Sequence, residues 1–176
     1  MRVSVKDLLL IMVSAFFAFF LATLLTWSGI TPWLSAIPFA SGLFEGVAPT
    51  NLGVQEEHLS PCPATPNCVV SQNTDASHAI EPLRYQGDRR SAQETLVKIL
   101  GVVPRTTIIE QKEGYIRAES RSRLLGFVDD LEFYLPADQP LIQVRSASRL
   151  GESDLGVNRR RVEQIRLALQ DLTAQP

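Results

Sequence analysis

Residues Phe127–Leu150 read FVDDLEFYLPADQPLIQVRSASRL. Apolar and polar side chains alternate along both halves of this stretch, which is typical of strands with two different faces. The residues between the halves, Ala137-Asp138-Gln139-Pro140, have the composition of a turn. We therefore predict two antiparallel strands, Phe127–Leu135 and Leu141–Leu150.

The residues before this pair extend it into a larger sheet. Two further strand-like runs, Thr106–Gln111 and Tyr115–Arg121, are separated by the tight turn Glu113-Gly114. Short connections favour antiparallel neighbours, because a parallel pair needs a long crossover. The sequence thus predicts a four-stranded antiparallel sheet.

Two helices are predicted to flank the sheet. Ser91-Ala92-Gln93-Glu94 matches a capping box at the start of a helix, and Gly101 suits its C-terminal cap. Apolar residues at helical spacing predict a last helix from Asn158 to about Leu172. The order helix, four strands, helix predicts an α+β domain with both helices packed on one face of the sheet.

Strand alternation separates the charged side chains from the apolar ones. Asp130 shares one face with Glu132, whereas Asp129 shares the apolar face with Leu131. Thirteen of the fifteen basic residues from His58 onward are arginine. Arginine makes two-point contacts with carboxylates and phosphates, so this bias indicates fixed ion pairs or anion binding.

The densest group of polar residues lies between Val144 and Arg166. With the two aspartates of the preceding strand, the candidate ligand-binding or ion-pair residues are Asp129, Asp130, Arg145, Ser146, Ser148, Arg149, Asp154, Asn158 and Arg160. One interpretation is an arginine–carboxylate network that locks the sheet to the last helix. A second is a pocket for an anionic or polar ligand at the loop Gly151–Gly156. A third is acid–base catalysis by Asp129 and Asp130, which is disfavoured because adjacent residues on a strand point to opposite faces.

The chain has two cysteines, Cys62 and Cys68. In an oxidising compartment they would form a disulfide. The alternatives are a zinc site with His58 and His78, whose spacing is irregular for zinc, and a redox-active dithiol, which lacks a basic neighbour in the local sequence. We expect no metal, no cofactor and no catalytic residue, since no familiar catalytic set is present.

A long uncharged segment precedes the domain. No charged residue lies between Asp7 and Glu45, and Leu8–Trp27 has the length of a membrane-spanning helix. We predict a transmembrane anchor over residues 1–30, a hydrophobic or interfacial linker over 31–57 and a soluble domain over 58–176. A cleaved signal segment is the alternative; its apolar region would be shorter and would be followed by a small-x-small site.

Charges around the anchor predict its orientation. Arg2 and Lys6 precede it and the first charges after it are acidic, which leaves the N-terminus in the cytoplasm. The net charge of −2 argues against nucleic acid as a partner. Because the chain is predicted to carry a membrane anchor, the partners expected are membrane lipid and an integral membrane protein complex.

Several short motifs resemble one known family. Asn67-Cys68-Val69 with Ser71, Phe127–Phe133, Arg145–Arg149 and Asp154–Arg159 are similar, in this order, to the bacterial and plastid family called domain of unknown function 1499. The resemblance covers about Pro61 to Leu169. It implies a small, often membrane-anchored or exported protein and transfers no catalytic residue; the cyanobacterial or plastid branch would imply a thylakoid or plasma-membrane setting.

These observations lead to two main hypotheses about function. The first is a membrane-anchored, non-catalytic accessory or binding module on the periplasmic or thylakoid-lumenal side. The rival hypothesis is an enzyme or carrier that acts on a small polar or anionic ligand at Arg145, Arg149 and Arg160. The missing catalytic set favours the first. A further, third hypothesis is a subunit that uses the apolar region Leu8–Phe44 to dock within a larger membrane complex.

Overall fold

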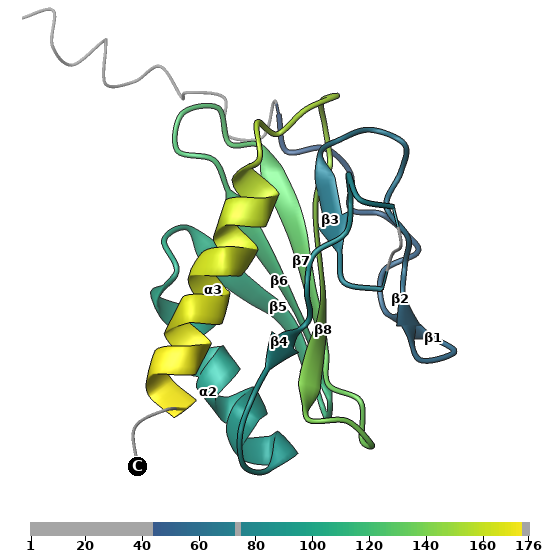
Figure 1. The fold of residues 1–176 in the computed structure, drawn as a ribbon. Coiled ribbons are helices and arrows are strands. Elements are labelled where there is room, and N and C mark those ends of the chain that lie inside the picture. The colour runs from purple at the N-terminus through teal and green to yellow at the C-terminus, as the bar shows by residue number, and fades with distance from the viewer. Residues whose placement is uncertain (1–43, 73–74, 174–176) are drawn as a thin grey trace, which may run out of the picture. The chain divides into compact units, whose positions relative to one another are not determined.

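The computed structural model describes residues 44–72 and 75–173. These residues form an α+β domain in which two helices cover one face of a mostly antiparallel sheet (Figure 1). The predicted anchor and its cytoplasmic N-terminus lie outside the described residues. Within 44–72 and 75–173, no helix has the length and apolar character needed to cross a bilayer.

The sheet has six strands, two more than predicted. Its main path runs in the order β3 (Cys68–Val70), β8 (Leu141–Ser148), β7 (Val128–Tyr134), β6 (Tyr115–Arg121) and β5 (Thr106–Lys112), and β4 (Leu83–Arg84) also pairs with β8. The four long strands agree with the predicted runs. The two additional strands are two and three residues long, too short to show alternation, and they pair antiparallel with successive parts of β8. A separate hairpin consists of β1 (Val54–Gln55) and β2 (His58–Leu59).

The first helix begins earlier than the sequence predicted. It is α2 (Arg89–Val102), and its N-cap is Asp88, whose Oδ1 accepts a hydrogen bond of 2.9 Å from the Ser91 backbone N–H. The prediction of Ser91 as N-cap was wrong because an aspartate three residues earlier satisfies that donor. Gly101 lies inside the last turn, and the C-cap is Val103.

The last helix follows the prediction closely. It is α3 (Val157–Thr173), and Val162, Ile165 and Leu169 on its inner face are at most 1% exposed. These side chains join the core between the helices and the sheet, together with Phe133 of β7. Burying each such side chain stabilises the domain by roughly 1.5–3 kcal/mol.

The other face of the sheet is partly covered by residues 44–66, so residues of the predicted linker contact the domain. The rings of Phe44 and Phe127 lie 5.2 Å apart, and Glu45 forms an ion pair with Arg121. Gly46 has a φ of +67°, and a Cβ added there would lie 2.9 Å from the Cβ of Arg149. Glycine therefore permits the close approach of this segment to the sheet.

Candidate functional site

Charged side chains that are buried or half-buried gather on the face of the sheet away from the helices. Strand register places Glu132 opposite Arg145 and also opposite Arg117, while Glu119 lies opposite Asp130. We call the set of Arg117, Glu119, Asp130, Glu132, Arg145 and Arg149 the sheet-face network. The register thus sets opposite charges side by side at Glu132, whereas the two facing carboxylates Glu119 and Asp130 are compensated by arginines.

Glu132 is the most buried member of the network, with no exposed surface. Its Oε1 accepts hydrogen bonds from the Tyr115 hydroxyl at 2.9 Å and from the Gly53 backbone N–H at 2.6 Å. Its Oε2 lies 3.3 Å from Nη1 of Arg145, which is 4% exposed. Burial and the Glu132 charge raise the pKa of the Tyr115 hydroxyl, which therefore stays protonated and donates.

Arg149 joins two carboxylates from different strands. Its Nε and Nη2 donate to the two oxygens of Asp130 at 2.8 and 2.9 Å, and Nη2 also donates to Glu119. Arg117 approaches the same pair, with Nη2 at 3.2 Å from Glu119 and 3.8 Å from Asp130. Hydrogen bonds to Asp130 and Glu119 raise the pKa of Arg149, so the guanidinium stays charged.

A second polar group lies on the helix side of the sheet. Asp129 accepts from the Ser148 hydroxyl at 2.6 Å and from Arg161 Nη2 at 2.7 Å. Asn158, which is fully buried, accepts from the Ser146 hydroxyl and from Arg161, and it donates to Ser148 at 3.0 Å. We call Asp129, Ser146, Ser148, Asn158 and Arg161 the helix-side cluster. It fixes the first turns of α3 to strands β7 and β8.

The loop between β8 and α3 uses its polar groups internally. Asp154 Oδ1 accepts from the Gly156 N–H at 3.0 Å and Oδ2 from the Asn158 N–H at 2.7 Å, so this side chain caps α3. Arg160 is exposed and donates to the backbone oxygen of Leu155 at 2.8 Å. Surface hollows near α2 and near β2, of about 840 and 350 Å³, are lined by other segments of the described chain.

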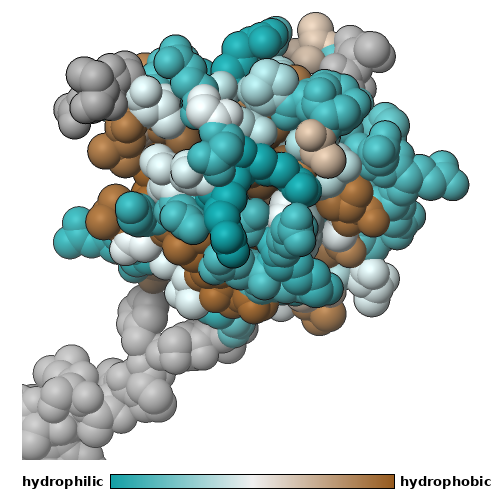
Figure 2. All heavy atoms as spheres, turned by 90° about the horizontal axis from the view of Figure 1, so that it is seen from below, coloured by the Kyte–Doolittle hydropathy of each residue, from teal (hydrophilic) through white to brown (hydrophobic). Residues whose placement is uncertain are grey.

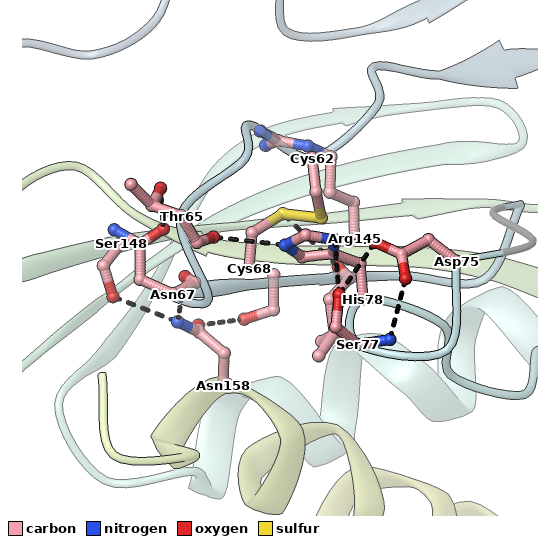
Figure 3. The surroundings of a disulfide bond; sticks show 12 residues. Cys62, Thr65, Asn67, Cys68, Asp75, Ser77, His78, Arg145, Ser148 and Asn158 are labelled. Carbon is pink, nitrogen blue, oxygen red and sulfur yellow. Dashed lines mark hydrogen bonds and ion pairs between the residues drawn. A yellow bond between two sulfur atoms is a disulfide. The ribbon is translucent and has the colours of Figure 1, made fainter. Parts of the chain in front are cut away.

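The disulfide between Cys62 and Cys68 is confirmed, and it closes a loop that contacts Asn158 of the helix-side cluster and His78 (Figure 3). Inside the loop, the Asn67 backbone oxygen accepts from Asn158 Nδ2 at 3.1 Å. On the other side, His78 Nε2 lies 3.2 Å from the Thr65 backbone oxygen. The disulfide thus holds the loop over the start of α3.

The structure divides the predicted site residues between two faces. Asp130, Arg145 and Arg149 belong to the sheet-face network, and Asp129, Ser146, Ser148 and Asn158 to the helix-side cluster. Asp154 caps α3 and Arg160 lies at the surface, so Arg145, Arg149 and Arg160 do not converge on one pocket.

Four residues that complete these groups were not among the predicted site residues. Strand register could have identified Arg117, Glu119 and Glu132, since each lies opposite a charged residue of the neighbouring strand. Helical spacing could have identified Arg161, which lies three residues after the buried Asn158 and therefore on the same side of α3. Arg160 is one position away and is directed elsewhere.

Within the described ranges, no three histidine, cysteine, aspartate or glutamate side chains are grouped so that they could hold a metal ion. The oxygens of the buried carboxylates instead face arginine guanidiniums of the same chain. Chemically, these groups act as paired charges that connect strands and helix.

The comparison with protein families identifies the domain. The family described as "Protein of unknown function (DUF1499)" matches residues 58–169, more than half of the chain. The chain belongs to this family. The match contains the disulfide, the sheet-face network and the helix-side cluster, but not Gly53 or Glu45. Among curated proteins and among solved structures, the searches found no match.

Acid is expected to weaken the DUF1499 domain through Asp75. Hydrogen bonds from the Ser77 hydroxyl and backbone N–H, and from His78, lower the pKa of Asp75 to about 2. A carboxyl with a lowered folded-state pKa contributes stability at higher pH, and this contribution is lost as the pH falls from near its ordinary value of about 4 toward 2. Asp75→Asn should therefore flatten the decline of unfolding free energy in that window.

Denaturant unfolding at several pH values measures this slope. Ser77→Ala, which removes one donor and leaves the carboxyl, should reduce the slope only in part. Identical slopes for the native chain and Asp75→Asn would contradict the role given to Asp75.

Proposed function

We propose that the protein is a membrane-anchored, non-catalytic accessory or binding module. Its α+β domain lies on the periplasmic or thylakoid-lumenal side and associates with a larger integral membrane complex. The partners are membrane lipid, through the uncharged segment Leu8–Trp27, and protein subunits of that complex, not nucleic acid.

The observation that carries the non-catalytic role is the pairing of the buried arginines within the chain. Arg145 faces Glu132, Arg149 faces Asp130 and Glu119, and Arg161 faces Asp129. An anionic ligand would have to displace a carboxylate that is itself buried, and the displaced charge would lack compensation. The charged residues are therefore better suited to bracing the domain than to binding substrate.

Two further features support the location. The Cys62–Cys68 disulfide is of the kind that persists in oxidising compartments. The basic residues Arg2 and Lys6 stand before the apolar segment, which favours a cytoplasmic N-terminus and export of the domain.

Affinity purification from native membranes tests the proposal. The full chain carries a C-terminal tag, and in the matched control an unrelated membrane-spanning helix of the same length replaces Leu8–Trp27. We expect the native chain to migrate in mild detergent as a complex with integral membrane proteins. Loss of these proteins from the control would place the contact on the anchor, and their retention would place it on the domain.

A native chain that migrates alone as a small species, in every mild detergent used, would contradict the accessory role. Turnover of a substrate by the purified chain would contradict the non-catalytic role.

A further inference from the structure

Exposed apolar side chains gather at one end of the domain. Among the described residues, eleven large apolar side chains are exposed, and seven of them lie in three segments that meet at the top of Figure 1. We call these segments, residues 44–47, 122–127 and 149–157, the loop end. The seven residues are Phe44, Val47, Leu124, Leu125, Leu150, Leu155 and Val157.

Direct contacts join the three segments into one surface. Phe44 packs against Phe127, and the Arg149 N–H donates at 3.0 Å to the backbone oxygen of Val128, the residue that follows the second segment. A Cβ on Gly46 would lie 3.0 Å from Cγ of Leu150, so the first segment also lies against the third. The apolar side chains therefore belong to one continuous end of the domain and are not scattered over its surface.

The exposed side chain of Leu155 adds no packing to the core of the domain. It is 83% exposed, and its φ of 54° lies in the left-handed region that a bulky side chain rarely adopts. Leu124 is 77% exposed at the tip of the loop between β6 and β7. Large apolar side chains that are grouped and exposed in this way mark a surface that contacts protein or membrane.

The charges of the loop end favour an anionic surface. Arg123 is exposed. Arg160, in the first turn of α3 beside the loop end, is also exposed and donates to the Leu155 backbone oxygen; within the described residues neither arginine forms an ion pair. Of the acidic residues there, Glu45 pairs with Arg121 and Asp154 caps α3, which leaves Glu152. Apolar tips flanked by arginines match the boundary between lipid headgroups and acyl chains, where arginine meets phosphate.

The chain itself indicates which surface this is. Phe44, the first described residue, packs at the loop end against Phe127, and in the sequence it follows a segment with no charge from Leu8 onward. The opposite end, seen in Figure 2, has mainly hydrophilic side chains in its middle, and its hollow is lined by polar residues such as Arg89, Arg90 and Glu113. One end of the domain is thus suited to lipid and the other to water.

We propose that the loop end rests on the surface of the membrane that holds the anchor, with Leu124, Leu125 and Leu155 in the interfacial region and Arg123 and Arg160 at lipid phosphates. This inference rests on the proposed function, because it requires an anchored domain. It adds a fixed orientation, in which the hydrophilic end faces away from the bilayer.

Photo-crosslinking of the full chain in vesicles tests the orientation. A benzophenone amino acid replaces Leu124, Leu155 or, as matched control, Leu172, which is 52% exposed near the other end of α3. The vesicles contain phosphatidylcholine alone or mixed with phosphatidylglycerol. Burial of one leucine-sized side chain favours the docked orientation roughly tenfold or more, so lipid adducts at positions 124 and 155 should exceed those at 172 by about this factor.

The phosphatidylglycerol mixture should give the larger yield, and salt should reduce the difference between the mixtures. Equal lipid labelling at positions 124, 155 and 172 would overturn the proposal. Adducts to a polypeptide instead of lipid at positions 124 and 155, in native membranes, would also overturn it. Flotation of the chain with the vesicles tests the anchor separately: a chain that floats without oriented labelling refutes the orientation alone, and one that does not float refutes the anchor.

Discussion

Replacing Glu132 by alanine is expected to lower the free energy of unfolding of the domain by about 3–5 kcal/mol. The side chain has no exposed surface and accepts from Tyr115, Gly53 and Arg145. Its removal leaves the guanidinium of the buried Arg145 side chain as a charge without compensation. Denaturant unfolding of the full chain in detergent, followed by circular dichroism, measures the loss.

Two further variants distinguish the cost of leaving a buried charge unpaired from the cost of removing a carboxylate side chain as such. Glu113→Ala removes a carboxylate that is 93% exposed and 3.6 Å from Arg89, and should change stability by at most about 0.5 kcal/mol. The double variant Glu132→Leu with Arg145→Met removes both charges and should be more stable than Glu132→Ala. A cost for Glu132→Ala no larger than that of Glu113→Ala would show that the sheet-face network does not stabilise the fold.

Replacing Arg149 by alanine is expected to have an effect of similar size, also about 3–5 kcal/mol. This guanidinium bonds both oxygens of Asp130, which is 1% exposed, and also Glu119. Without it, the buried Asp130 would be left with Arg117 at 3.8 Å, whereas Glu119 would keep both Arg117 and Arg121. Arg149→Lys should recover only part of the loss, because an ammonium cannot make the two-point contact.

The matched control for this variant is Arg90→Ala. Arg90 is 89% exposed and lies 4.0 Å from Glu94, so its removal should be nearly neutral. The same unfolding experiment compares the three variants. Full stability of Arg149→Ala would mean that its carboxylate partners are stabilised by something other than the ion pairs described above.

The regular part of the fold could be predicted because its elements are long. Alternation over seven or eight residues fixed both the strands and their faces, and it placed Asp129 and Asp130 on opposite sides. Strands β3 and β4 could not be found in this way, because two or three residues show no period. Their pairing with β8 depends on tertiary contacts.

The sequence indicated which types of residue form the polar groups, but not which side chains contact one another. Proximity in sequence suggested that Arg145, Arg149 and Arg160 act together, yet the turn into α3 directs Arg160 to the surface, and Arg161 reaches Asp129. The Gly53 contact to Glu132 uses a backbone N–H, which no side-chain pattern can reveal.

The central claim is that the anchor holds a disulfide-bonded, ion-paired domain in an oxidising compartment. The decisive measurement is the oxidation state of Cys62 and Cys68 together with the cell fraction that contains the chain. Intact cells are treated with acid to trap thiols, fractionated, and labelled with a polyethylene-glycol maleimide before or after reduction. We expect the chain to lie in the membrane fraction and to shift in mobility only after reduction, whereas a Cys62→Ser variant should shift without reduction. A chain dissolved in the cytosol, with Cys62 and Cys68 both labelled before reduction, would contradict the account.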